Sequence, residues 1–178
     1  ERWLENYWIK NRNAVDKGKN GPTFGWHVPA TQHSKANAAE AENGLMAQGL
    51  EVHTASAPFK AGNISINTGD WIIRGDQPYR TIADIYFAVQ DYSMSNPSPY
   101  DDLGWTYPMM RNLIITPVTD KALLTGAMAP VKGPVRATGG ISGTGPTVIV
   151  EHTGDNLLTQ FRWQFATVKM SAAEAEFE

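Results

Sequence analysis

The sequence predicts an α/β fold, in which a mainly parallel sheet is flanked by helices and preceded by a short leading helix. Residues 23–28 and 50–54 have the composition of strands, and residues 34–48 between them have the apolar spacing of a helix. This succession is typical of a βαβ unit, whose two strands are parallel neighbours joined by a right-handed crossover. Residues 147–150, Thr-Val-Ile-Val, form a continuous apolar run that is typical of a strand buried on both faces.

The crossover helix is predicted from its cap and its apolar face. Ser34 is a residue type that accepts a hydrogen bond at a helix N-terminus. Ala38, Ala41 and Leu45 follow at helical spacing, so they share one face. We therefore expect Leu45 to pack against the sheet and Glu42 to lie on the solvated face.

The remaining elements are predicted from shorter patterns. They comprise a helix over residues 1–15, strands at 64–66 and 71–73, a helix after Pro78 and an apolar strand within 113–118. A last helix is expected over residues 157–161, capped by Asp155 or Asn156. The alternation of Phe161, Trp163 and Phe165 leaves a strand open as the alternative there.

Turn-forming residues divide the chain into three parts. Residues 1–22 are the leading helix and its linker, which ends in a polar stretch rich in Gly, Asn and Pro. Residues 23–126 are the α/β domain. Residues 127–178 begin with a Gly/Pro-rich connection, and we expect them to be the start of a second α/β lobe or a continuation of the same sheet.

Composition excludes several classes of function. The formal net charge is −3, and no run of Lys and Arg marks a basic face, so a nucleic-acid partner is not expected. The chain has no cysteine, which excludes disulfides, thiolate metal ligands and cysteine nucleophiles. Apolar runs are far shorter than the roughly 18 residues of a membrane span.

No catalytic or metal-binding motif is found. Of the four histidines, only His152 has a carboxylate three residues later, Asp155, and a zinc site needs a further ligand. Capping of a helix by Asp155 is the simpler interpretation. The pair nevertheless follows the predicted strand 147–150, where open α/β sheets bind ligands, so we assign His152, Asp155 and Asn156 as candidate ligand-binding residues. The glycine-rich residues 139–145 precede a predicted strand instead of following one, unlike a phosphate loop.

The leading helix carries a candidate interface. Trp3, Tyr7 and Trp8 recur at helical spacing, and each such ring can bury on the order of 150–250 Å². Monomers seldom expose a large apolar patch of this kind. We therefore expect these residues to contact another domain or another copy of the chain, by self-association.

Several motifs carry a family resemblance. They are Asn11-Arg12-Asn13-Ala14-Val15, residues 24–30, 48–53, 69–73 and 77–79, and Pro99-Tyr100-Asp101-Asp102-Leu103-Gly104-Trp105-Thr106. On these motifs the whole chain resembles the region that follows the catalytic domain in large bacterial zinc carboxypeptidase-like proteins, of the carboxypeptidase A-like metallopeptidase family. Residues 148–156 resemble the strand and turn that open a class I glutamine amidotransferase-like fold.

The resemblance implies a flavodoxin-like or amidotransferase-like sheet and a parent protein that is an exported, periplasmic or extracellular zinc hydrolase. The metal and catalytic motifs of that family match no position here, and amidotransferase chemistry needs a cysteine. We therefore expect no catalytic residue, metal or cofactor in this chain, with zinc only in the parent's catalytic domain. Glu1 is not an initiator methionine, which fits a mature secreted chain whose leader has been removed or, as we expect, an internal segment of such a parent. The expected function is a non-catalytic accessory domain that packs on the adjacent peptidase domain or shapes access to it. The alternative is a small-ligand binding module at His152 and Asp155.

Overall fold

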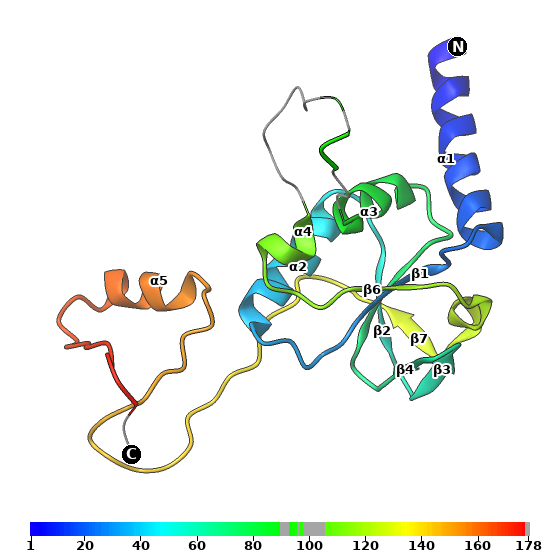
Figure 1. Ribbon diagram of the computed structural model, residues 1–178. Helices are drawn as coiled ribbons and strands as arrows, with labels where there is room; N and C mark the ends of the chain where they lie inside the picture. The colour runs from blue at the N-terminus through cyan, green and yellow to red at the C-terminus, as the bar shows by residue number, and fades with distance from the viewer. Residues whose placement is uncertain (90–92, 96, 98–105, 177–178) are drawn as a thin grey trace. The chain divides into compact units, whose positions relative to one another are not determined.

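The computed structural model describes residues 1–89, 93–95, 97 and 106–176. It divides into two compact units, residues 1–139 and residues 140–178. The first unit holds the sheet and most of the helices (Figure 1). The second unit contains one helix, α5, Leu157–Gln164.

The first unit begins with helix α1, Arg2–Asn20, which is longer than the predicted helix over residues 1–15. Its other helical segments are α2 (Lys35–Ala47), α3 (Arg80–Phe87), α4 (Tyr107–Met110) and the 3-10 helix η1 (Lys121–Thr125). Its main sheet consists of β1 (Gly25–Val28), β2 (Val52–Ala55), β5 (Trp71–Arg74), β6 (Thr116–Val118) and β7 (Met128–Pro130). A separate hairpin pairs β3 (Phe59–Ala61) with β4 (Ile64–Ile66).

The prediction of a mainly parallel, flavodoxin-like or amidotransferase-like sheet is wrong. The strand order is β6-β1-β5-β2-β7, and every pairing in this sheet is antiparallel. Strands β1 and β2 are joined by α2 and run in the same direction, because both are antiparallel to β5. They are not neighbours, however, since β5 lies between them: Ile73 pairs with Trp26 on one side and with Val52 on the other.

The unit that was predicted as a βαβ motif is therefore a split βαβ motif. The same arrangement occurs a second time, because β5 and β6 lie on either side of β1 and are connected through α3 and α4. Together these elements have the β-α-β-β-α-β order of a ferredoxin-like fold. The β3–β4 hairpin is inserted between β2 and β5, and β7 extends the sheet beside β2.

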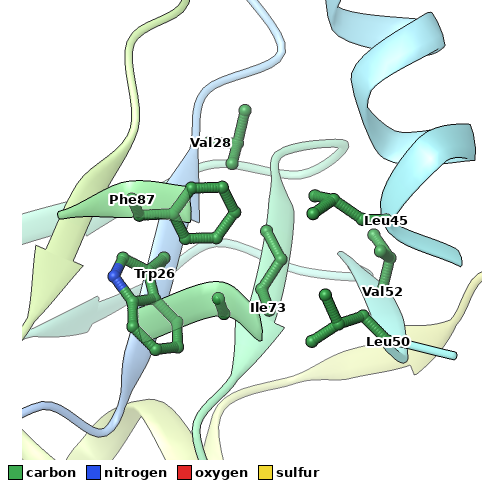
Figure 2. Close-up of a cluster of buried hydrophobic side chains, with 8 residues drawn as sticks. Trp26, Val28, Leu45, Leu50, Val52, Ile73 and Phe87 are labelled. Atoms are coloured by element: carbon green, nitrogen blue, oxygen red, sulfur yellow. The ribbon is translucent and has the colours of Figure 1, made fainter. Parts of the chain in front are cut away.

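Apolar side chains cover both faces of the sheet. One cluster lies between the sheet and helices α2 and α3, and Figure 2 shows its larger members. It contains Trp26, Val28, Leu45, Leu50, Val52, Ile73, Ala83 and Phe87. The opposite face is covered by the hairpin and η1, through Ala55, Ala61, Ile66, Ile72, Val118 and Leu123. Neighbouring strand residues such as Ile72 and Ile73 are therefore both fully buried. As a result the strands have continuous apolar sequences, which are usual for parallel sheets.

Helix α2 confirms one side-chain expectation and contradicts another. Leu45 is fully buried in the core, as predicted, and Ser34 caps the helix by accepting a hydrogen bond from the Asn37 backbone amide. Glu42, however, is buried, not solvated. The reason is that α2 is covered on a second side: Leu113, with the half-buried Tyr107, packs against its Ala38 and Ala41 face.

The predicted buried strand over residues 147–150 is not present. These residues have no strand assignment, and Val148, Ile149 and Val150 are each more than half exposed. The apolar segment 113–118 forms a strand only over β6. Both of the outer strands of the sheet carry a proline, Pro117 in β6 and Pro130 in β7, which lacks the amide donor that a further strand would need.

Helix α1 is held on the first unit by a close approach of two glycines. Gly18 is buried, and a Cβ atom built on it would lie within 2.1 Å of the Gly75 carbonyl carbon. Gly18→Ala is therefore expected to lower the stability of the first unit or to detach α1, although alanine is the better helix former by about 1 kcal/mol. The measurement is urea unfolding followed by circular dichroism. Asn13→Ala, at an exposed position of the same helix, should be neutral or slightly stabilising; equal effects of the two substitutions would show that this contact is absent in solution.

Candidate functional site

The first half of α1 exposes the aromatic residues that were predicted as an interface. Exposed fractions are 73% for Trp3, 64% for Leu4, 41% for Tyr7 and 59% for Trp8. We call these four residues the α1 stripe. Figure 1 shows this end of α1 extending away from the sheet, beyond the helices that cover it. The second half of the helix packs on the body of the unit instead, where Ala14 and Gly18 are buried.

Polar contacts fix the orientation of α1. The hydroxyl groups of Tyr7 and Tyr79 are hydrogen-bonded at 3.0 Å, and the Lys17 ammonium donates to the Asp84 carboxylate at 2.9 Å. Tyr79 precedes α3 and Asp84 lies within it. With 3.6 residues per turn, positions 7, 11, 14 and 18 share one helix face. The stripe therefore continues the face that is buried lower down the helix.

The stripe is organised within the helix itself. The rings of Trp3 and Tyr7 are stacked, with centroids 5.8 Å apart, and the Arg12 guanidinium lies 5.1 Å from the centroid of the Trp8 ring. Such stacking and cation–π contacts are the geometries that aromatic rings prefer. They favour the observed ring orientations, which lowers the side-chain entropy that is lost when a partner covers the rings.

The candidate ligand residues lie in the second unit, before α5. His152 is exposed, and Asn156 is the N-terminal cap position of α5 but makes no side-chain capping bond. The Asp155 carboxylate accepts hydrogen bonds from the Thr153 hydroxyl and from the Leu157 amide, both at 2.8 Å. These bonds lower the pKa of Asp155, the Thr153 contact most strongly. Residues 147–150, which were expected to place these side chains at the end of a strand, do not form one. That the three residues bind a ligand stays a prediction.

Sequence analysis missed a buried His–Asp pair. His27 Nε2 lies 2.8 Å from Asp70 Oδ2, and both side chains are buried. The Asp70 carboxylate also accepts the backbone amides of Ala30 and Asn67. Burial alone would raise the pKa of Asp70, but these hydrogen bonds outweigh it and the pKa is lowered. The pair links the end of β1 to the turn before β5, so it has a structural role that no sequence spacing indicated.

A second polar cluster lies at the far end of β5. The Arg74 guanidinium donates two bonds to the Asp76 carboxylate, at 2.9 and 2.8 Å, and a third to the Leu124 carbonyl at 3.0 Å. Burial, and then the charge of Arg74, lower the pKa of His53. The Nδ1 atom of His53 is buried without a hydrogen-bond partner among the described residues. The charge of Arg74 is neutralised by Asp76 within this cluster.

The carboxyl of Glu42 is buried and strongly perturbed. Burial raises the pKa of Glu42 to about 8, and its Oε2 atom has no hydrogen-bond partner in the described part of the chain. Glu42 is therefore neutral near pH 7. Nearby, the pKa of Tyr107 is raised, first by burial and to a lesser degree by Glu42.

Two features of the described residues bear on cofactors and membranes. Within residues 1–89, 93–95, 97 and 106–176, no group of three or more His, Asp or Glu side chains is placed to hold a metal ion. In the same residues no helix is long and apolar enough to cross a membrane, which agrees with the sequence. That this chain carries no metal or cofactor remains a prediction.

Comparison with known proteins found no match: no family model, no curated protein and no solved structure is similar to this chain. The family resemblance therefore rests on the quoted motifs alone. Of the longest motif, residues 99–106, only Thr106 lies among the described residues.

Proposed function

We propose that this chain is a non-catalytic accessory domain of a zinc carboxypeptidase-like hydrolase, which packs on the adjacent peptidase domain. The observation that carries the proposal is the exposure of the second unit. None of residues 140–176 is buried, yet this stretch is rich in large apolar side chains. Those exposed are Ile141, Val148, Ile149, Val150, Leu157, Phe161, Trp163, Phe165, Val168 and Met170.

A segment with this composition and no core of its own favours a role as an interaction element. At about 25 cal/mol per Å² of apolar surface, covering several such side chains contributes several kcal/mol, which the segment does not obtain within itself. Trp163 is 89% exposed on α5, and the Phe161 and Phe165 rings lie together on that helix with centroids 4.9 Å apart. A neighbouring domain of the same parent is the partner that the family resemblance implies. An exported location for that parent is part of the proposal.

Binding to the peptidase domain provides the test. The coding sequence around this segment identifies that domain if it contains a His-x-x-Glu pair and a later His. We expect the separately purified domain to bind this chain, and Trp163→Glu to weaken binding about tenfold or more, because aromatic anchors dominate interfaces. Isothermal titration calorimetry measures the affinity, with Gln164→Glu, about 100° from Trp163 around α5, as the matched control. Failure to bind, or chelator-sensitive hydrolysis of a C-terminal peptide substrate by this chain alone, would contradict the proposal.

A further inference from the structure

We infer that the α1 stripe is a self-association surface, on which two copies of this chain pair through antiparallel α1 helices. The inference concerns a different surface from the one in the proposed function and does not depend on it. The four residues of the α1 stripe are spaced symmetrically along the chain. Trp3 and Trp8 lie at equal distances along the chain from the point between positions 5 and 6, and so do Leu4 and Tyr7.

This symmetry is what a two-fold interface requires. In an isologous contact the same patch of both copies must be complementary to itself. If the two-fold axis passes between positions 5 and 6, Leu4 of each copy faces Tyr7 of the other, and the tryptophans flank this centre on both sides. The paired region covers residues 1–10, in the first half of α1, and the N-terminal end of this helix extends away from the sheet (Figure 1). The buried residues of α1 begin at Ala14, and the Tyr7 hydroxyl bonds Tyr79, so the Tyr79 side chain would border the second helix.

Charges on the flanks of the stripe agree with this pairing. In an antiparallel pair of helices, residues on the same flank of the two copies meet. Lys10 then comes beside Trp3 of the other copy, where an ammonium group and an aromatic face attract each other. The residues that point away from the pair, Glu5 and Asn6, are polar. Ile9 also points away, about 170° from the centre of the stripe at 100° per residue.

The area of the stripe is sufficient for a concentration-dependent dimer. A fully covered aromatic ring buries about 150–250 Å², so the exposed fractions of the three rings and Leu4 amount to roughly 500 Å² per copy. Two copies together bury about 1,000 Å², the lower limit for a specific interface. A weak, concentration-dependent dimer is therefore expected.

Sedimentation velocity of the full chain, from about 1 to about 100 µM, tests the inference. We expect the sedimentation coefficient to rise with concentration, and Leu4→Glu to abolish the rise because it places two carboxylates at the centre of the pair. Ile9→Glu is the matched control, since it adds the same charge to the opposite side of the same helix and should leave dimerisation unchanged. Leu4 is largely exposed, so Leu4→Glu should keep the circular dichroism spectrum of the parent. A monomer at every concentration, a dimer that survives Leu4→Glu, or equal loss with Ile9→Glu would each overturn the inference.

Discussion

Leu45→Asp is expected to unfold the first unit under conditions in which the parent chain is folded. Leu45 is fully buried between α2 and the sheet, in the cluster that contains Val52 and Ile73 (Figure 2). The substitution removes apolar contacts and places an unpaired carboxylate in their position. The expected cost is about 4 kcal/mol or more, a large part of a typical stability of about 5–15 kcal/mol.

Urea unfolding followed by circular dichroism measures this effect. The matched control is Ala47→Asp, which adds the same side chain two residues later, where α2 is exposed. That control should cost only about 1 kcal/mol, because its carboxylate stays in water and the cost is limited to helix propensity and an unfavourable interaction with the C-terminal end of the helix dipole. If both variants lose similar stability, the face of α2 that is buried has been assigned incorrectly.

Local patterns in the sequence predicted elements better than their arrangement. The crossover helix, its Ser34 cap and the burial of Leu45 all follow from spacing within one segment, and the structure confirms them. The partner of a strand does not follow from such spacing. β5 enters between β1 and β2 although it comes after both in the chain, and only long-range contacts decide this.

The error in sheet type has a physical cause. Apolar runs suggest parallel strands because parallel sheets are usually covered on both faces. Here the β3–β4 hairpin and η1 cover the face that an antiparallel sheet commonly leaves to solvent. Ile72 and Ile73 are therefore both buried, and their sequence does not distinguish the two sheet types.

The candidate sites show the same division between local and long-range information. The aromatic spacing of α1 predicted which residues share a face, and the structure places those residues on an exposed part of the helix. The His27–Asp70 pair joins residues 43 positions apart, so no motif could indicate it. Burial of Glu42 depends on Tyr107 and Leu113 covering a second side of α2, again through contacts distant in sequence.

Stability of the first unit is expected to fall as the pH rises from about 4.5 to about 8, because of Glu42. The pKa of this carboxyl is about 8 in the folded chain, against an ordinary value of 4.5. Below pH 4.5 both the folded and the unfolded chain hold the proton, so Glu42 contributes no pH dependence there. Above pH 4.5 the unfolded chain releases the proton and the folded chain keeps it. The free energy of unfolding then falls by up to about 1.4 kcal/mol per pH unit.

Glu42→Gln isolates this contribution. Glutamine has nearly the shape of the protonated carboxyl and no charge, so the variant and the parent should have similar stability near pH 5. Near pH 8 the variant should be more stable, by an amount on the order of 4 kcal/mol. The pKa of His53 is lowered on folding, and this contributes an opposite slope below about pH 6.5. His53 is present in both proteins, so its contribution cancels in the difference between them.

Urea midpoints at about pH 5 and about pH 8 give the comparison. Glu40→Gln is the matched control two residues earlier on α2, where the carboxylate is 58% exposed and pairs with Arg111 at 3.2 Å. An exposed ion pair contributes less than about 1 kcal/mol, and the Glu40 variant should therefore follow the pH dependence of the parent. If the stability of Glu42→Gln has the same pH dependence as the parent, the Glu42 carboxyl is accessible to water in solution. Tyr107 and Leu113 then do not exclude water from that side of α2.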